Sequence, residues 1–293
     1  MRAVRVGGVL VSLLAACSRG VEDPAPATIA EQVLEADRGF AREAASAGFI
    51  EAAGRMFADS VIMPVPGRGF AQGRVDALSA LQDNPLNRGA RADWRPVRVG
   101  TSADGSQAFT FGYFRLLAAD SVVNMKYMTY WVRTPQGWRA IAFKRGRGGP
   151  APDTTMMAPS LPHAASAAGD HPDERTIAEH RRSLAAAEQA FSEEAQRVGL
   201  GNAFVANGRA DAVNMGLGAH YVVGAARIGQ GMGLDSTPSP VSWASDYKTI
   251  VASSGDLGIT FGTIRPNNGQ GPSFPFFTIW RREPGGMWKY IAE

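Results

Sequence analysis

The sequence has few of the residues that build disulfides and metal sites. Its 293 residues include one cysteine, Cys17, so an internal disulfide framework and a cysteine-rich zinc site are both excluded. The four histidines, His163, His171, His180 and His220, leave little material for a histidine-based metal cluster. We therefore expect neither a bound metal ion nor another cofactor.

The chain also lacks a strong excess of charge of either sign. It has 30 Lys and Arg against 27 Asp and Glu, and no basic stripe with interleaved aromatic residues, so we expect no nucleic-acid partner. Hydrophobic residues make up 45% of the sequence, which is enough for packed cores and excludes a mostly disordered chain. The length allows two domains of ordinary size.

A targeting segment opens the chain. Arg2 and Arg5 precede eleven largely apolar residues, 6–16, a run too short to span a bilayer but with the proportions of a signal-peptide core. The run leads into Leu-Ala-Ala-Cys, which resembles the lipobox of bacterial lipoproteins, and the resemblance implies that Cys17 is lipidated. Ser18, in place of the Asp that often signals inner-membrane retention, points to the outer membrane of the cell envelope, facing the periplasm. The alternative is an ordinary secretory signal with an incidental cysteine.

The chain contains two copies of one module. Thr-Ile-Ala-Glu at 28–31 recurs at 176–179, and each copy has the spacing of a helix capping box and opens a pattern with helical period. At an offset of 151 residues, segment 36–52 matches segment 187–203 at six of 17 positions. Later matches have similar offsets: Trp94 with Trp243, 110–112 with 260–262, and 131–138 with 280–288.

These features divide the chain into five parts and predict an α+β fold. We expect a signal peptide, a tether, a first module, a linker rich in Pro, Gly and Ala, and a second module, at residues 1–16, 17–27, 28–144, 145–175 and 176–293. Each module is predicted to begin with helices and to continue with antiparallel strands, which in the first module lie near 61–65, 94–102, 107–117, 122–133 and 138–143. This order predicts a curved sheet wrapped over an N-terminal helix.

Three tracts carry a resemblance to a known family. They are Phe-Ala-Asp-Ser-Val at 57–61, Ser-Gly-Asp-Leu-Gly at 254–258 and the closing Trp-Arg-Arg…Gly…Trp hairpin at 280–288. The chain resembles the nuclear transport factor 2-like (NTF2-like) superfamily, most closely its SnoaL-like and ketosteroid-isomerase-related bacterial branches. The resemblance implies cone-shaped, cystatin-like modules, each enclosing an apolar pocket and often forming dimers.

The same resemblance implies where a catalytic base would lie, and neither module has one there. In ketosteroid isomerases an Asp lies just before a Pro in the tract that Met63 and Asn214 match here. The tyrosine that the family places on its first helix corresponds approximately to Phe40 and Phe191. Proton abstraction needs a carboxylate or an imidazole within hydrogen-bond reach, so we expect neither cone to have an acidic group for it.

One alternative keeps catalysis in the second module. His220, predicted on its first strand, and Asp246, predicted on its second, could form a base and the carboxylate that orients it, as scytalone-dehydratase-like sites require. The first module contains no histidine and cannot form such a pair. The competing interpretation is a partly exposed histidine and an edge-facing aspartate.

Side chains that share strand faces predict a ligand site in the first module. Tyr113 and Arg115 on one strand, and Lys126 and Tyr130 on the next, could ring an apolar cavity together with Met63. Such a cavity would suit a small hydrophobic, amphipathic or anionic molecule. Plain core packing is the alternative interpretation.

The matching strand of the second module has an uncharged face formed by Phe274, Phe276, Thr278 and Trp280, which favours a filled core or a dimer surface. Together, these patterns predict a lipid-anchored protein whose two modules bind a small hydrophobic ligand or a partner without catalysis. One alternative is a lyase or isomerase acting in the second module only. Another is a structural protein whose modules pair as an internal pseudo-dimer, or a homodimer.

Overall fold

The computed structural model describes residues 25–163, 172–234 and 237–293. The predicted signal peptide, Cys17, most of the tether and His171 of the linker lie outside these ranges. Within them, no helix is both long enough and apolar enough to cross a membrane.

The first module is a mixed sheet with strand order β2-β1-β6-β5-β4-β3, covered on one face by helices. Its helices are α1 (Pro26–Ala47), α2 (Phe49–Met56), α3 (Arg74–Asp83) and the short 3₁₀ helix η1 (Pro85–Asn87). Its strands are β1 (Phe57–Val65), β2 (Gly69–Gln72), β3 (Arg91–Thr101), β4 (Gln107–Ala118), β5 (Ser121–Thr134) and β6 (Gly137–Arg147). Neighbouring strands are antiparallel except β1 and β6, which are parallel.

The second module repeats this topology, with strand order β8-β7-β12-β11-β10-β9 and a parallel pair β7–β12. Its helices are α4 (Glu174–Val198), α5 (Leu200–Asn207) and α6 (Ala225–Met232). Its strands are β7 (Gly208–Asn214), β8 (Val222–Val223), β9 (Val241–Val251), β10 (Leu257–Pro266), β11 (Phe274–Arg282) and β12 (Trp288–Ala292). The predicted α+β class is confirmed, and the shared topology agrees with a tandem duplication.

The first helix of each module begins before the Thr-x-x-Glu motif that the sequence suggests as its cap. α1 begins at Pro26, whose fixed φ suits the first helical position, and no side chain caps it. α4 begins at Glu174, and the carboxylate of Asp173 accepts a hydrogen bond of 2.8 Å from the backbone N–H of Thr176. The predicted helices exist, but their predicted caps are wrong because Pro26 and Asp173 offer helix starts further upstream.

Each sheet bends over its helix at a bulge where glycine is required. Where the register of β3 and β4 shifts, a Cβ on Gly112 would lie 2.0 Å from the carbonyl oxygen of Arg95. The matching shift between β9 and β10 lies beside Gly262, where a Cβ would lie 1.7 Å from the carbonyl oxygen of Ala244. Because bulges bend and twist a strand, these positions help to give each sheet its concave inner face.

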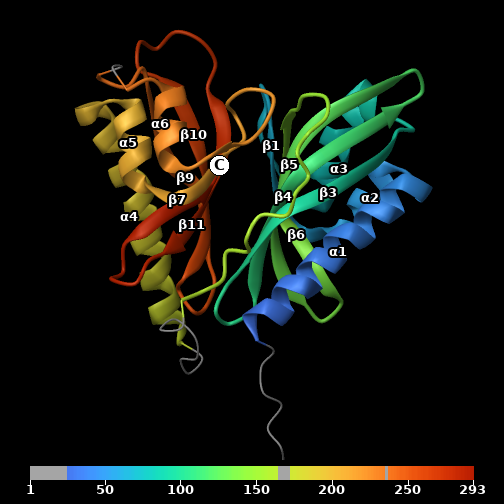
Figure 1. Ribbon diagram of the computed structural model, residues 1–293, viewed down its shortest axis with the longest axis horizontal. Coiled ribbons are helices and arrows are strands. Elements are labelled where there is room, and N and C mark those ends of the chain that lie inside the picture. The colour runs from blue at the N-terminus through green and yellow to red at the C-terminus, as the bar shows by residue number, and fades with distance from the viewer. Residues whose placement is uncertain (1–24, 164–171, 235–236) are drawn as a thin grey trace, which may run out of the picture.

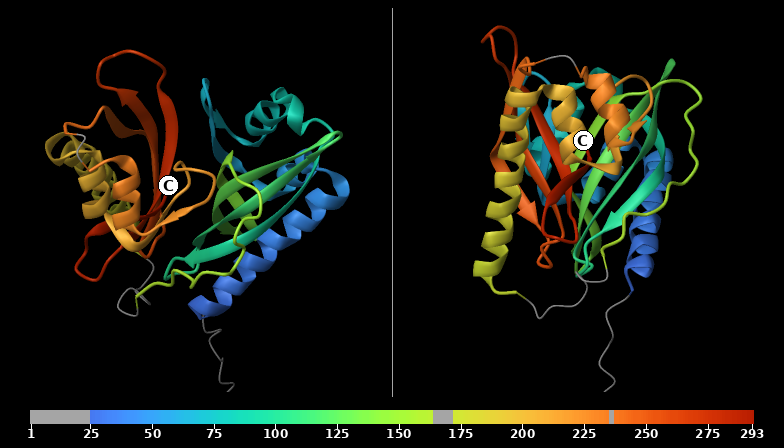
Figure 2. Two further views of the ribbon diagram at one scale, coloured as in Figure 1. Left: turned by 45° about the horizontal axis from the view of Figure 1, so that its top comes forward. Right: turned by 60° about the vertical axis from the view of Figure 1, so that its left-hand side comes forward.

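The two sheets pack against each other through their outer faces. Figure 1 shows α1 and α4 on opposite sides of the molecule, and in both views of Figure 2 the strands lie between the helices of the two modules. Apolar cores form between each sheet and its own helices and also between the two sheets. The core between the sheets includes Phe109, Phe111 and Met128 of the first module and Ile259, Phe261 and Phe277 of the second.

A buried arginine forms hydrogen bonds that connect the two modules and the linker. Arg281 of β11 forms an ion pair of 2.6 Å with Asp256 and donates to the carbonyl oxygens of Thr101 and Ser160 at 2.9 Å each. Ser160 belongs to the linker, and its N–H donates to the carbonyl oxygen of Val99 in β3 at 2.9 Å. This part of the linker is therefore fixed along the edge of the first sheet.

Removing the Arg281 side chain should destabilise the whole protein. Arg281→Ala leaves the carboxylate of Asp256 buried without its partner, which typically lowers the free energy of unfolding by about 3–5 kcal/mol. Urea denaturation at pH 7 measures the loss. Arg42→Ala, which removes an exposed ion pair with Glu35, is the control and should change stability by less than about 1 kcal/mol. If both substitutions lower the free energy of unfolding by the same small amount, Arg281 does not stabilise the contact between the modules and the linker.

Candidate functional site

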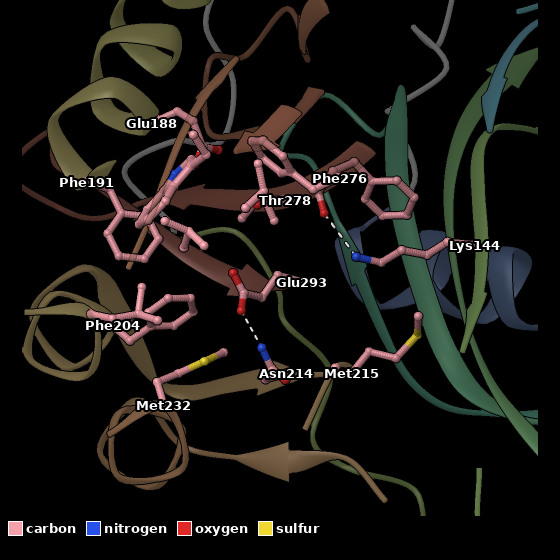
Figure 3. Close-up of a pocket in the computed structure, with 16 residues that line it drawn as sticks. Lys144, Glu188, Phe191, Phe204, Asn214, Met215, Met232, Phe276, Thr278 and Glu293 are labelled. Carbon is pink, nitrogen blue, oxygen red and sulfur yellow. Dashed lines mark hydrogen bonds between the residues drawn. The ribbon is translucent and has the colours of Figure 1, made fainter. Parts of the chain in front are cut away.

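A cavity of about 310 Å³ lies inside the second module, between its sheet and its helices (Figure 3). Its walls are mostly apolar and include Phe191, Phe204, Met232, Trp243, Ile264 and Phe276. Three ionisable side chains also line it: Glu188, Glu293 and Lys144. No group of three or more His, Cys, Asp and Glu side chains in the described ranges could hold a metal ion. An apolar cavity with a few polar groups is the usual composition of a small-molecule site.

Four differences between the repeats explain why this cone is hollow. At matching positions the first module has the larger side chain: Phe49 against Leu200, Phe114 against Ile264, Phe143 against Glu293, and Tyr127 against Phe276. In the first module these side chains are at most 2% exposed, and the ring centroids of Phe49 and Phe114 are 5.3 Å apart. The smaller groups leave that space unfilled in the second module.

Arg145 of β6 closes the packed cone of the first module. Its guanidinium lies 4.5 Å from the ring centroid of Phe49 and 5.1 Å from that of Phe114. It also donates a hydrogen bond of 3.0 Å to the side-chain oxygen of Asn87. The stem and the guanidinium together cover the aromatic core of this module.

Glu188 is the acidic residue held most firmly in the cavity wall. It lies on the buried face of α4 and is 0% exposed. The indole N–H of Trp243 donates to one carboxyl oxygen at 2.7 Å, while Trp280 and the hydroxyl of Thr260 donate to the other. Burial raises the pKa of Glu188 to about 7, although these hydrogen bonds act in the opposite direction. Near neutral pH its carboxyl group can therefore carry a proton.

The first module keeps an acid at the same place but covers it. Asp37, which matches Glu188, accepts hydrogen bonds from the indole of Trp94 at 2.6 Å and from the hydroxyl of Tyr127 at 2.7 Å. Burial raises the pKa of Asp37 as well. In the second module Phe276 occupies the position of Tyr127 and has no hydroxyl group. No phenol therefore covers Glu188, which faces the cavity.

Glu293, the residue after β12, lies near the centre of the cavity (Figure 3). Its Oε1 accepts a hydrogen bond from the side-chain amide of Asn214, the residue that matches the base position of ketosteroid isomerases. No described residue donates to its Oε2. Burial raises the pKa of Glu293 to about 7, while the positive charge of Lys144 lowers it. Glu293 is therefore an acid whose second oxygen is available to a bound molecule.

Lys144 reaches the cavity from the first module. It lies on β6, and its Nζ donates to the carbonyl oxygen of Phe277 at 3.0 Å and lies 4.2 Å from the centroid of the Phe277 ring (Figure 3). No carboxylate of the described residues lies within ion-pair distance of it. Burial lowers the pKa of Lys144 to about 8, and the charge of Glu293 opposes this shift. The rim of the cavity is thus built from both modules.

His220 and Asp246 are not brought together by the structure. His220 lies in an exposed loop rather than on the predicted strand, because β7 ends at Asn214. Asp246 lies on β9 and forms an ion pair of 2.6 Å with Arg265. Neither residue lines the cavity of the second module, and no hydrogen bond joins them.

The polar residues predicted to ring a cavity in the first module do not point into its cone. Tyr113, Lys126 and Tyr130 lie on the outer face of the sheet, which meets the second module. The Nζ of Lys126 donates to the carbonyl oxygens of Gly218 and His220 at 2.8 and 3.2 Å. Alternation along a strand identifies residues that share a face, but it does not say which face the helix covers.

The remaining predicted residues lie in different places. Met63 is 5% exposed and packs in the inner core of the first module. Arg115 is exposed and forms an ion pair with Asp93. In the second module the uncharged face is not simply filled core, because Phe276 and Thr278 line the cavity.

A second cavity, of about 390 Å³, lies at the boundary between the modules. Its lining includes Tyr113, His220 and Tyr221 together with Asp153 of the linker. The ring centroids of Tyr113 and Tyr221 are 5.5 Å apart, so the two rings pack directly against each other. This cavity places Tyr113 and His220 together, although the sequence suggested them for separate sites.

Sequence reasoning missed Glu188, Glu293 and Lys144, because it looked for an acid only at the family's base position, whereas the second cone has two carboxyl groups elsewhere in its lining. A signal for Glu188 was present in the repeat, because the offset of 151 residues pairs it with Asp37. Both acids lie on the apolar, buried face of their helix, where a charged residue is unusual. Lys144 had no such signal, since its partners lie in the other module.

Comparisons with known proteins concern single modules. No protein-family model matches the chain, and no curated protein matches it in sequence. An NTF2-like protein with a cystatin-like fold from Novosphingobium aromaticivorans is 22% identical, over 39% of this chain and 79% of that chain, with a TM-score of 0.31. An NTF2-like superfamily protein from Salmonella enterica is 13% identical, over 44% of this chain and 97% of that chain, with a TM-score of 0.35. Both bear the superfamily name that the sequence motifs suggested, and neither similarity bears on activity.

Replacing Glu188 by glutamine tests the buried acid. Because the folded-state pKa is raised to about 7 from 4.5, the stability that the protonated group contributes is lost as the pH rises through this interval. Glu188→Gln cannot ionise, so its free energy of unfolding relative to the wild type should rise by about 1–3 kcal/mol from pH 5 to pH 8, whatever the constant cost of placing its NH2 group beside a hydrogen-bond donor. Urea denaturation at both pH values measures this difference. Glu51→Gln, at an exposed site, should show the same change in free energy of unfolding between pH 5 and pH 8 as the wild type. If Glu188→Gln shows that same change too, the raised pKa is refuted.

Proposed function

We propose that the second module binds a small, largely apolar molecule and that the first module is its structural partner. The observation that carries this proposal is the contrast between matching cones. One is packed with aromatic side chains, whereas the other contains an apolar cavity of about 310 Å³ with Glu188 and Glu293 in its lining. Unfilled space in a core costs stability, so its presence beside the buried Glu188 and the partly buried Glu293 favours a binding role.

The cavity indicates the chemistry of its ligand. Its walls are mostly apolar, so most of the ligand surface should be hydrocarbon or aromatic. Glu293, when protonated, can donate a hydrogen bond to a carbonyl or hydroxyl oxygen of the ligand. A second carboxylate in the lining, Glu188, disfavours ligands with several negative charges. A neutral molecule with one or two oxygen atoms fits these conditions.

A second candidate function is proton transfer to or from the bound molecule. Glu293 has a pKa of about 7 and an oxygen without a hydrogen-bond donor among the described residues, so it can act as an acid or a base near neutral pH. This candidate corresponds to the lyase or isomerase alternative, with Glu293 in the role that the sequence suggested for His220 and Asp246.

We also propose that the protein is a lipoprotein, anchored through Cys17 in the outer membrane and facing the periplasm. The lipobox-like tract, the lone cysteine at its end and the Pro-containing tether that follows support this location. Several acyl chains anchor a protein stably because each buried methylene contributes about 0.8 kcal/mol. The binding module would then sample small molecules in the envelope.

Filling the cavity tests the binding proposal. The double variant Leu200→Phe/Ile264→Phe installs the residues that the first module has at these positions. It should weaken binding of the uncharged fluorescent probe N-phenyl-1-naphthylamine at least about tenfold, because two added rings occupy the space a ligand needs. A fluorescence titration gives the Kd. Val122→Phe, at an exposed position of the first module, should bind as the wild type does. Equal affinity of the double variant and the wild type would refute the site.

Substituting the cysteine tests the anchor. Cys17→Ser removes the thiol to which acyl chains attach, so the protein should move from the membrane fraction to the soluble fraction of the producing bacterium. Ultracentrifugation of lysed cells, followed by immunoblotting, measures the distribution. Ser18→Ala is the matched control and should stay with the membranes. If Cys17→Ser still sediments with membranes, the lipobox interpretation fails.

A further inference from the structure

Lys144 has surroundings that the other lysines of the chain do not share. The sequence contains four lysines, at positions 126, 144, 248 and 289. Lys126 is held by two carbonyl oxygens, Lys248 is exposed, and Lys289 donates to the carbonyl oxygen of Ala206. Of these side chains, Lys144 alone lines the apolar cavity of the second module. Its nitrogen has a single carbonyl acceptor and an aromatic ring beside it.

This environment makes the uncharged amine more accessible than it is in a solvated lysine. An ammonium ion needs several acceptors or a carboxylate to replace its water shell, and Lys144 has one acceptor and no ion-pair partner among the described residues. Burial accordingly lowers its pKa to about 8, so the neutral fraction at pH 7 is much larger than for a solvated lysine. A neutral lysine in an apolar pocket is a nucleophile toward carbonyl carbon.

We propose that Lys144 captures an aldehyde or ketone ligand of this cavity as an imine. The proposal rests on the proposed binding function and specifies its ligand class as neutral carbonyl compounds with an apolar body. Three observations carry it: the position of Lys144 at the rim, the apolar walls, and Glu293 facing the same space. The first module thus contributes the reactive group, and the second module contributes the cavity.

The chemical step is balanced without an oxidant or a reductant. The lone pair of the neutral Nζ attacks the carbonyl carbon, and the carbonyl π electrons move to oxygen, which takes up a proton as nitrogen loses one. The resulting carbinolamine loses its hydroxyl group as water when the carboxyl group of Glu293 protonates it. The nitrogen lone pair forms the C=N bond, and the nitrogen returns its remaining proton to the Glu293 carboxylate. The net change is amine plus carbonyl compound to imine plus one water.

Reductive trapping tests this proposal. The full chain is incubated with benzaldehyde and cyanoborohydride at pH 7, which converts an imine into a stable benzylamine. Digestion and mass spectrometry then locate the benzyl group. We expect Lys144 to be labelled roughly tenfold or more faster than Lys248, because each unit of pKa changes the neutral fraction tenfold. The labelling rate should be highest between about pH 7 and pH 8, because it needs both the neutral amine of Lys144 and the protonated carboxyl group of Glu293.

Matched variants separate this proposal from the binding function. Lys144→Arg keeps the charge and a donor for the Phe277 carbonyl but should lose the label, whereas Lys248→Arg should keep it at Lys144. N-phenyl-1-naphthylamine, which has no carbonyl group, should compete with labelling. If the wild type binds this probe but Lys144 is labelled no faster than Lys248, the imine proposal is overturned and the binding function stands. If the probe does not bind and Lys144 is labelled no faster than Lys248, both the imine proposal and the binding proposal fail.

Discussion

The packing of the two sheets against each other is the constraint on which the rest of the structure depends. Each curved sheet has two apolar faces, and each face needs a cover. Helices cover the inner face, and the other module covers the outer face, where Phe111 and Phe277 belong to a common core. The same contact places Lys144 of the first module against Phe277 of the second. Neither module is therefore complete alone, and the rim of the cavity exists only because they are joined.

This arrangement leaves the inner faces free to diverge. The outer faces share one core, whereas the apolar core inside each cone is formed by residues of that module alone. In the first module Phe143 and Tyr127 fill the cone, and the hydroxyl of Tyr127 covers Asp37. In the second, Glu293 and Phe276 at the same positions leave a cavity beside Glu188. Duplication thus produced one packed module, which supports the pair, and one hollow module whose cavity is lined by the buried Glu188 and the partly buried Glu293.

The sequence was sufficient for the helices, the long strands and the α+β class, but not for the strand order, with its parallel pairs β1–β6 and β7–β12, or for the site. Period and repeat matching predicted the helices and long strands because those signals are local. They could not decide which sheet face meets the helix, so Tyr113 and Tyr130 were expected inside the cone and lie outside it. Buried acids such as Glu188 look like surface charge in a helix rich in Ala and Glu, unless the repeat alignment is followed. Lys144 joins its site through a contact between modules, and no local pattern encodes such a contact.

Xenon binding tests the central claim, that one cone is hollow and its duplicate is packed. Xenon enters apolar cavities in protein interiors and is located directly by its anomalous scattering in pressurised crystals. The account predicts a xenon atom in the second module, in contact with Phe191 and Phe276, and none between Phe49 and Phe143 of the first. Xenon in the first cone, or in neither cone, would contradict it.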